Sequence, residues 1–157
     1  MKNCINILLC WIFTISTIYA QSVITGKVVK IADGDTFTML VEQNQQVKIR
    51  LNSIDCPESK QDFGQQAKQY LSKLVFGKVV SVSYKNKDRY GRVLGTVYID
   101  NVNVNEEMIK AGMAWHYKQY DKSTKLADME TTARQNRIGL WSHSDPIAPW
   151  NFRKKKK

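Results

Sequence analysis

One arginine and two acidic residues lie close together in the sequence, at Arg50, Asp55 and Glu58. A crowded carboxylate costs free energy unless a cation or a metal ion neutralises it, so these residues are the first candidates for a reaction site. Pro57 lies between the two acids and cannot continue a strand ladder, because it has no backbone N–H. We therefore expect both acids on a stiff turn at a strand end. Considered alone, the group could also be an ordinary surface salt bridge.

Two further charged clusters fall at predicted turns, over residues 33–35 (Asp-Gly-Asp) and 88–92 (Asp-Arg-Tyr-Gly-Arg). Each alone is typical of a turn or a solvated hairpin. Together the three clusters supply several carboxylate oxygens and paired arginines, but no imidazole. Carboxylates suit Ca²⁺ or Mg²⁺, paired arginines suit a phosphate that gains charge in the transition state, and a free carboxylate can activate water. The combination is suited to metal-assisted phosphodiester hydrolysis.

Alternating apolar patterns predict the strands that must position these clusters. Val47, Ile49 and Leu51 share one face of such a strand, which leaves Lys48 and Arg50 on the other face. Short polar turns separate the first three strands, which favours a meander. The predicted strands cover residues 23–31, 36–41, 47–51, 79–84 and 92–99.

Helical periodicity predicts three helices in the same stretch of chain. One runs from Gly64 to Gly77, a short one is capped by Asn105, and the last starts at Asp121 or Ser123. This order predicts an α+β fold, mainly β: a five-stranded barrel of the oligonucleotide/oligosaccharide-binding (OB) type with about three packed helices. The alternative is a β-sandwich, which the helices disfavour.

The N-terminal segment has the composition of a secretory signal peptide. A short basic start precedes an apolar run that ends at Tyr19, and Ala20 offers a small residue for cleavage. An uncleaved anchor is the alternative. We therefore expect residues 1–20 to be a signal peptide, 21–150 a single domain and 151–157 a basic tail, in a secreted or periplasmic protein.

The charge and the cysteines restrict the function further. The chain carries a formal net charge of +10, which favours a polyanionic partner such as nucleic acid, heparin-like sugar or anionic lipid. Cys4 and Cys10 leave with the signal peptide, so Cys56 has no intramolecular disulfide partner. A nucleophilic role for Cys56 is less favoured than a small residue filling a turn, because both histidines lie far away in sequence.

The order and spacing of these motifs resemble the staphylococcal nuclease (thermonuclease) family, from about Val23 to Trp150. That resemblance implies an OB-type barrel and a Ca²⁺-dependent nuclease. It would hydrolyse phosphodiester bonds of DNA and RNA with little sequence specificity and leave 3′-phosphate ends. The matching segments are Asp33-Gly34-Asp35-Thr36, Arg50-Leu51, Asp55-x-Pro57-Glu58, Asp88-x-Tyr90-Gly91-Arg92, Val104-Asn105-Glu106 and Gly139-Leu140-Trp141.

The resemblance also implies a set of metal ligands. Asp35 and Asp55 match the side-chain ligands of the calcium ion, and the backbone carbonyl of Cys56 matches a third ligand. Many members of the family have threonine at the position of Cys56, a difference that a backbone ligand tolerates. Asp33 matches an acid near the metal rather than a ligand.

For catalysis, the resemblance assigns Glu58 as the general base, and Arg50 and Arg92 as the arginines that hold the scissile phosphate. Arg89 and Tyr90 resemble residues that contact a terminal phosphate.

Aromatic residues later in the chain are candidates for stacking on bases. Tyr117 is favoured over Tyr120 for this role, whereas Trp115 is expected in the core and His116 on the surface.

Two other functions are compatible with parts of the sequence. A catalytically inactive OB-fold module would bind nucleic acid without cleaving it, and a basic surface protein would bind polyanionic sugar or lipid. The complete set of acids and arginines favours the enzyme. We expect a monomer without a stable protein partner and without membrane contact after signal cleavage. The basic run Arg153–Lys157 is expected to be disordered and solvated, adding salt-sensitive attraction to nucleic acid.

Overall fold

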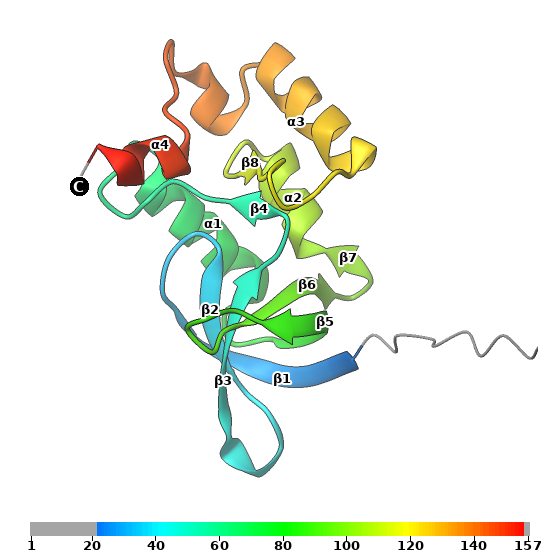
Figure 1. Cartoon of the computed structure of the whole chain (residues 1–157). Coiled ribbons are helices and arrows are strands. Elements are labelled where there is room, and N and C mark those ends of the chain that lie inside the picture. The colour runs from blue at the N-terminus through cyan, green and yellow to red at the C-terminus, as the bar shows by residue number, and fades with distance from the viewer. Residues whose placement is uncertain (1–21, 156–157) are drawn as a thin grey trace, which may run out of the picture.

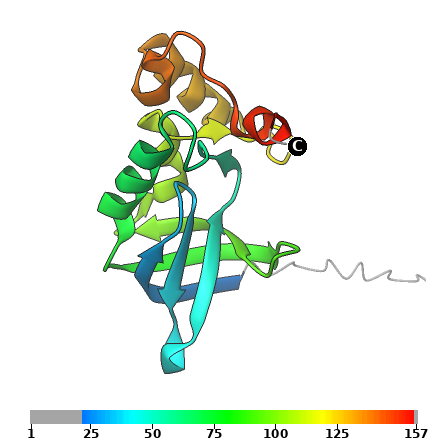
Figure 2. The ribbon, with the colours of Figure 1, turned by 90° about the vertical axis from the view of Figure 1, so that its left-hand side faces the viewer.

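The computed structural model describes residues 22–155, so the predicted signal peptide lies outside the described residues. Figures 1 and 2 show a β-barrel at one end of the molecule and helices packed at the other. The barrel strands are β1 (Ser22–Ile31), β2 (Thr36–Leu40), β3 (Gln46–Leu51), β5 (Val79–Lys87) and β6 (Val93–Ile99).

The strand order β3-β2-β1-β5-β6 closes on itself because β3 also pairs with β6. All neighbouring pairs are antiparallel except β3–β6, which is parallel and aligns Ile49 with Val93 and Leu51 with Gly95. On the other side of β6, Gly95 leaves room for a side chain of β5, since a Cβ atom would lie 2.4 Å from a Val82 methyl carbon. The closed five-stranded barrel with packed helices confirms the predicted fold, and the β-sandwich alternative was wrong.

The barrel interior is filled by apolar side chains that alternate along the strands. Phe37, Met39 and Ile49 are fully buried on β2 and β3, as are Val82 and Val97 on β5 and β6. Because one face of each strand is committed to this core, the register is fixed and the strand ends are held in place.

Helices close one end of the barrel and form the other half of the molecule. The α-helices are α1 (Gly64–Val75), α2 (Val104–Lys110), α3 (Thr124–Gln135) and α4 (Pro149–Lys154). The short elements are η1 (Glu42–Asn44), β4 (Ile54–Asp55), β7 (Val102–Asn103), β8 (Trp115–His116) and η2 (Gly139–Ser142). Helix α1 buries Ala67, Leu71 and Val75 against the barrel, as its helical spacing predicted. Within the described residues, every helix is too short or too polar to cross a membrane.

Some predicted boundaries were wrong for identifiable reasons. Strand β5 continues through Lys87, because pairing with β6 extends into the charged segment expected to be a loop. Helix α2 is capped by Asn103, whose side chain accepts from the Glu106 N–H, whereas Asn105 lies inside the helix. Ser123 caps α3, in agreement with one of the two predicted caps.

Asn105 ties α2 to the barrel instead of capping the helix. Its side chain accepts from the Val97 N–H at 3.0 Å and donates to the Asn52 carbonyl at 2.9 Å. The residue is buried, so these bonds satisfy an amide that would otherwise lack partners.

The helical half has an aromatic core of its own. Trp115 packs edge-on against Trp141, with ring centroids 4.5 Å apart, and the Arg134 guanidinium lies 3.7 Å from the Trp141 centroid. Trp115 is half-buried and packs against this cluster, in agreement with the packing role predicted for it. His116 is buried rather than on the surface, and its Nε2 pairs with Asp121 at 2.9 Å.

Candidate active site

The barrel brings the three charged clusters to one edge of the sheet. Thr36 pairs with Arg50 across β2 and β3, and the Leu51 N–H donates to the Asp35 carbonyl at 2.9 Å. The turn between β5 and β6 joins them through Arg92, whose Nη1 lies 3.5 Å from the Thr36 hydroxyl. Residues far apart in sequence therefore meet because their strands end together.

Arg50 connects the two aspartates of the site. Its guanidinium lies 2.6 Å from Asp35 and 2.8 Å from Asp55 in two ion pairs, and it also donates to the carbonyls of Leu51 and Ile54. Only 13% of the Arg50 side chain is exposed, so these contacts are little screened by solvent. Asp35 and Asp55 thus lie within the reach of a single guanidinium.

The turn around Cys56 orients Asp35. The Cys56 N–H donates to Asp35 Oδ2 at 3.0 Å, and its Sγ donates to the Gly34 carbonyl at 3.2 Å. Gly34 packs so closely that a Cβ atom there would lie 2.8 Å from the Cys56 Cβ. Burial raises the pKa of the Cys56 thiol well above its ordinary value, which keeps it protonated and supports a packing role.

Arg92 is aimed at the site by Asp88. Asp88 Oδ2 accepts from Arg92 Nε at 2.7 Å, while Oδ1 accepts from the backbone N–H groups of Tyr90 and Arg92. Burial acts to raise the pKa of Asp88, but these hydrogen bonds outweigh it and hold the pKa below its usual value. Asp88 is therefore a charged anchor that binds Nε of Arg92 and leaves its Nη1 to face the Thr36 hydroxyl.

Glu58 follows Pro57 at the rim of the same edge, with 40% of its side chain exposed. Its carboxylate pairs with Arg153 of α4 at 2.8 Å. Arg153 also donates to both oxygens of Asp55, at 2.8 Å and 3.3 Å. A third arginine therefore enters the site, from a segment that was predicted to be a solvated tail.

A sequence signal for α4 was present at Pro149. Proline is favoured at the first position of a helix, and Trp150, Phe152 and Arg153 follow it. The prediction of a disordered, solvated run from Arg153 was wrong for Arg153 itself, which lies in a helix and contacts Asp55.

Two acids at this edge, Asp33 and Asp55, are disfavoured as anions by the fold. Burial, and then the nearby Asp35, raise the pKa of Asp33 to about 6. Burial also raises the pKa of Asp55, even though Arg153 and Arg50 act to lower it. Crowded carboxylates of this kind favour the binding of a cation.

The residues present fit a hard divalent cation such as Ca²⁺. Asp35 and Asp55 supply carboxylate oxygens, and Ca²⁺ readily completes its shell with backbone carbonyls and water. Among residues 22–155, His, Cys, Asp and Glu side chains form no group of three or more that could hold a metal ion. The predicted ligand set of two side chains and a carbonyl is compatible with that finding.

The residues predicted to contact the substrate lie around the site. Tyr90 is exposed in the β5–β6 turn, with the guanidinium of Arg89 4.8 Å from its ring centroid. Tyr117 stacks on Trp150 of α4, with centroids 5.1 Å apart and planes within 3°, and contacts Tyr120 edge-on. Their roles in binding nucleic acid remain predictions.

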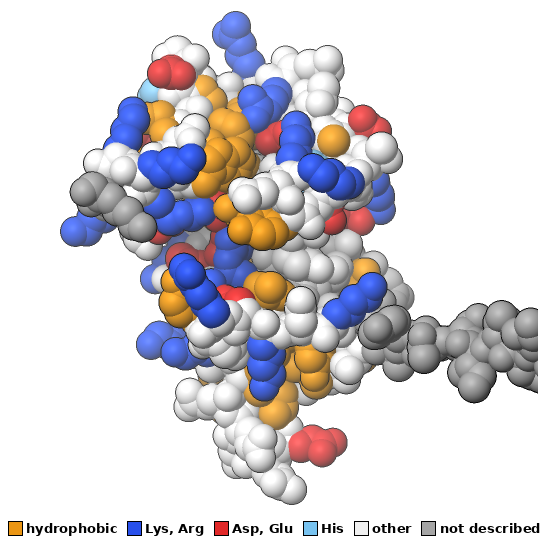
Figure 3. All heavy atoms as spheres, in the orientation of Figure 1, with side chains coloured by type: hydrophobic (Ala, Val, Ile, Leu, Met, Phe, Trp, Pro, Cys, Tyr) orange, Lys and Arg blue, Asp and Glu red, His pale blue; other side chains and the backbone are white. Residues whose placement is uncertain are grey.

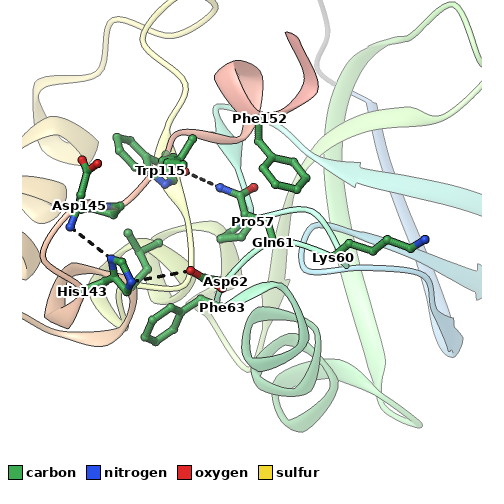
Figure 4. Close-up of a pocket in the computed structure, with 12 residues that line it drawn as sticks. Pro57, Lys60, Gln61, Asp62, Phe63, Trp115, His143, Asp145 and Phe152 are labelled. Atoms are coloured by element: carbon green, nitrogen blue, oxygen red, sulfur yellow. Dashed lines mark hydrogen bonds and ion pairs between the residues drawn. The ribbon is translucent and has the colours of Figure 1, made fainter. Parts of the chain in front are cut away.

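The molecular surface reflects the same arrangement. On the face in Figure 3, lysine and arginine side chains spread over both halves, and some acidic side chains are partly covered between the halves while others are exposed at the periphery. Close to Glu58, a pocket of about 290 Å³ opens between the loop before α1 and the C-terminal segment. Figure 4 shows Pro57, Phe63, Trp115 and Phe152 in its wall, with His143 contacting Asp62.

Comparisons with known proteins agree with this geometry. The profile of the family described as staphylococcal nuclease homologue matches residues 48–143. A protein of Escherichia coli described as an uncharacterized endonuclease is 46% identical over 134 residues, covering 85% of this chain and 87% of that protein. A similarly described protein of Haemophilus influenzae is 44% identical over 146 residues, 93% of this chain and 82% of that protein. A micrococcal nuclease of Shigella flexneri is 43% identical over 143 residues, 84% of this chain and 82% of that protein.

Proposed function

The chain belongs to the staphylococcal nuclease family, and we propose that it is a calcium-dependent nuclease that hydrolyses phosphodiester bonds of DNA and RNA. The observation that carries the proposal is the convergence of Asp35, Asp55 and two arginines at one barrel edge. The pairing of acids with arginines matches a site that holds both a cation and a phosphate.

Asp35, Asp55 and the Cys56 carbonyl would hold the calcium ion. The ion would neutralise charge on the scissile phosphate and lower the barrier to attack by water. The carboxylates are already turned toward a shared cation, because Arg50 contacts both of them. Arg50 can exchange one of these carboxylates for a phosphate oxygen of the substrate, since guanidinium binds both types of anion in the same fork geometry.

Glu58 and Arg92 would act on the reacting atoms. The Glu58 carboxylate is partly exposed at the rim, where it can take a proton from the attacking water. Arg92, anchored through Nε, has its Nη groups available for the phosphate oxygens on which charge develops. Donors fixed in advance are effective because they need no rearrangement in the transition state.

The wider parts of the proposal come from the resemblance and the N-terminal sequence. We expect cleavage with little sequence preference that leaves 3′-phosphate ends, by a monomer that is secreted or periplasmic after removal of residues 1–20. Arg89, Tyr90 and Tyr117 would contact the nucleic acid. The net charge of +10 supports attraction to a polyanion.

The test is cleavage of single-stranded DNA and of RNA by protein purified without residues 1–20. Reactions with Ca²⁺, with Mg²⁺ and with a chelator would be compared in the wild type, Glu58→Gln and Glu107→Gln. Glu107 is a matched control, because it pairs with Lys110 on α2. We expect cleavage with calcium only, lost in Glu58→Gln and kept in Glu107→Gln. Salt-sensitive binding without cleavage under every condition would instead identify an inactive OB-fold module.

A further inference from the structure

The C-terminal helix α4 brings Arg153 into direct contact with two acids of the proposed site. Arg153 Nη2 lies 2.8 Å from Asp55 Oδ2, and Nη1 lies 2.8 Å from Glu58 Oε1 and 3.3 Å from Asp55 Oδ1. One guanidinium thus bridges a predicted calcium ligand and the predicted general base. The hydrogen bonds that Arg153 donates to Asp55 and to Glu58 outweigh its partial burial and raise the pKa of Arg153, so it stays charged.

Helix α4 is docked in the fold rather than lying loose on it. Trp150 stacks face to face on Tyr117 and meets Trp115 edge-on at 5.5 Å between centroids. The Gln61 side chain donates to the Ile147 carbonyl and so ties the approach to α4 to the loop that follows Glu58. Figures 1 and 2 both show α4 returning to the end of the molecule where β4 lies. These contacts fix the direction from which Arg153 enters the site.

The two acids depend on Arg153 to different degrees. Asp55 also pairs with Arg50 through Oδ1, so it keeps a cationic partner without Arg153. Glu58 has no other ion pair among the described residues, and its carboxylate is more exposed than that of Asp55. Loss of Arg153 would therefore free the Glu58 side chain to adopt several rotamers, while Asp55 would remain oriented.

We propose that Arg153 is a positioning residue of the active site, which fixes the Glu58 carboxylate and occupies Asp55 until a divalent cation takes that carboxylate. The inference rests on the proposed calcium site at Asp35 and Asp55. A guanidinium and a calcium ion compete for the same carboxylate oxygens, and their like charges repel at close range. Removing the charge of Arg153 should therefore strengthen calcium binding but weaken catalysis through Glu58.

The experiment compares the wild type with Arg153→Gln, Arg153→Lys and Lys154→Gln. Lys154 is a matched control because it is an exposed cation on the same helix and would change the net charge equally. Calcium affinity is measured by titration calorimetry without nucleic acid, and kcat and KM are measured on single-stranded DNA at saturating calcium. Thermal unfolding of each variant checks that α4 and the barrel remain folded.

We expect Arg153→Gln to lower the calcium Kd about tenfold relative to Lys154→Gln and to reduce kcat about tenfold or more, with a smaller change in KM. Arg153→Lys should recover part of both effects, because it restores the charge without the bidentate fork. A helix that only stabilises the fold would move neither the calcium Kd nor kcat at saturating calcium.

Three results would overturn the inference. A calcium Kd in Arg153→Gln equal to that of Lys154→Gln would show that Arg153 does not compete for Asp55. Weaker calcium binding would show that Arg153 supports the metal, and an unchanged kcat would show that it does not position Glu58. Failure of the wild type to bind calcium would be distinct, because it would remove the proposed function together with this inference.

Discussion

Two carboxylate environments in this molecule show opposite behaviour. At the barrel edge, burial and a neighbouring acid raise the pKa of Asp33 to about 6. In the helical half, burial also acts to raise the pKa of Asp121, but hydrogen bonds from the Ser123 N–H, His116 and Ser53 outweigh it and lower the pKa. The same residue type is thus destabilised as an anion in one region and stabilised in the other.

The difference separates a carboxylate that the fold stabilises as an anion from one that it disfavours. Asp121 connects β8, the start of α3 and the loop at Ser53. Its carboxylate is hydrogen-bonded to His116, to the Ser123 N–H and to the Ser53 hydroxyl. At the barrel edge, burial is the main cause that raises the pKa of Asp33 and of Asp55, so the fold disfavours both anions. Perturbed acids that gather in this way are typical of functional sites, because function requires them to be kept at some expense of stability.

Arg92 at the barrel edge and Arg134 in the helical half can be compared in the same way, and the largest effect is expected for Arg92. We expect Arg92→Ala to reduce turnover about 10²- to 10³-fold, because a donor to the developing phosphate charge is lost. Arg134→Ala should leave turnover nearly unchanged and lower the free energy of unfolding by about 1–2 kcal/mol, because Arg134 packs over Trp115 and Trp141. Steady-state cleavage assays and thermal unfolding would measure both.

The assignment is wrong if Arg92→Ala loses stability and Arg134→Ala loses turnover. An unfolded circular dichroism spectrum for Arg92→Ala would make Arg92 a structural residue. Loss of turnover in a folded Arg134→Ala would extend the functional region into the helical half.

Asp33→Asn should give the next largest effect, and it is a gain in stability. The folded pKa of Asp33 lies above its ordinary value, so the stability that its protonated form contributes is lost as the pH rises through about 6. An amide cannot ionise and avoids that loss. We expect the variant to be about 1–2 kcal/mol more stable than wild type at pH 8 and equal to it near pH 3, where both side chains are neutral.

Chemical denaturation at these two pH values, without divalent cations, would measure the effect. A variant that is less stable than wild type at pH 8 would show that the Asp33 anion is well compensated by the fold.

Asp121→Asn should have a smaller effect of the opposite sign. Because the folded pKa of Asp121 is lowered, its anion contributes stability at neutral pH, and this contribution is lost as the pH falls through the folded pKa. We expect the variant to lose about 1 kcal/mol at pH 7 and to approach wild type as the solution becomes strongly acidic. Urea titrations from pH 7 downward would follow the gap, and a gap that widens in acid would contradict this assignment.

Much of this arrangement could be predicted from sequence because local patterns determine it. Alternation of apolar residues located the strands, and turn residues such as Gly34 and Pro57 located the acids at strand ends. Once strands close into a barrel, residues at their ends must approach one another, so Arg50 meets Asp35 and Asp55. The predicted chemistry therefore followed from the predicted topology.

What could not be predicted depends on contacts between distant segments. Helix α4 spans only Pro149–Lys154 and carries no apolar repeat long enough to identify it. The helix is held by the stacking of Trp150 on Tyr117, and this contact between distant segments forms only in the folded chain. For the same reason Arg153 was assigned to a tail, and His116 to the surface, although its partner Asp121 makes it part of the core.

The most direct test of the account is the effect of calcium on thermal unfolding at pH 8, in the wild type and in Asp35→Asn. A ligand that binds only the folded protein stabilises it by about 2–3 kcal/mol at a hundredfold excess over Kd. We expect calcium to raise the unfolding temperature of the wild type clearly and that of Asp35→Asn little or not at all. No calcium effect on the wild type, or equal effects on both proteins, would contradict a cation site at the two aspartates.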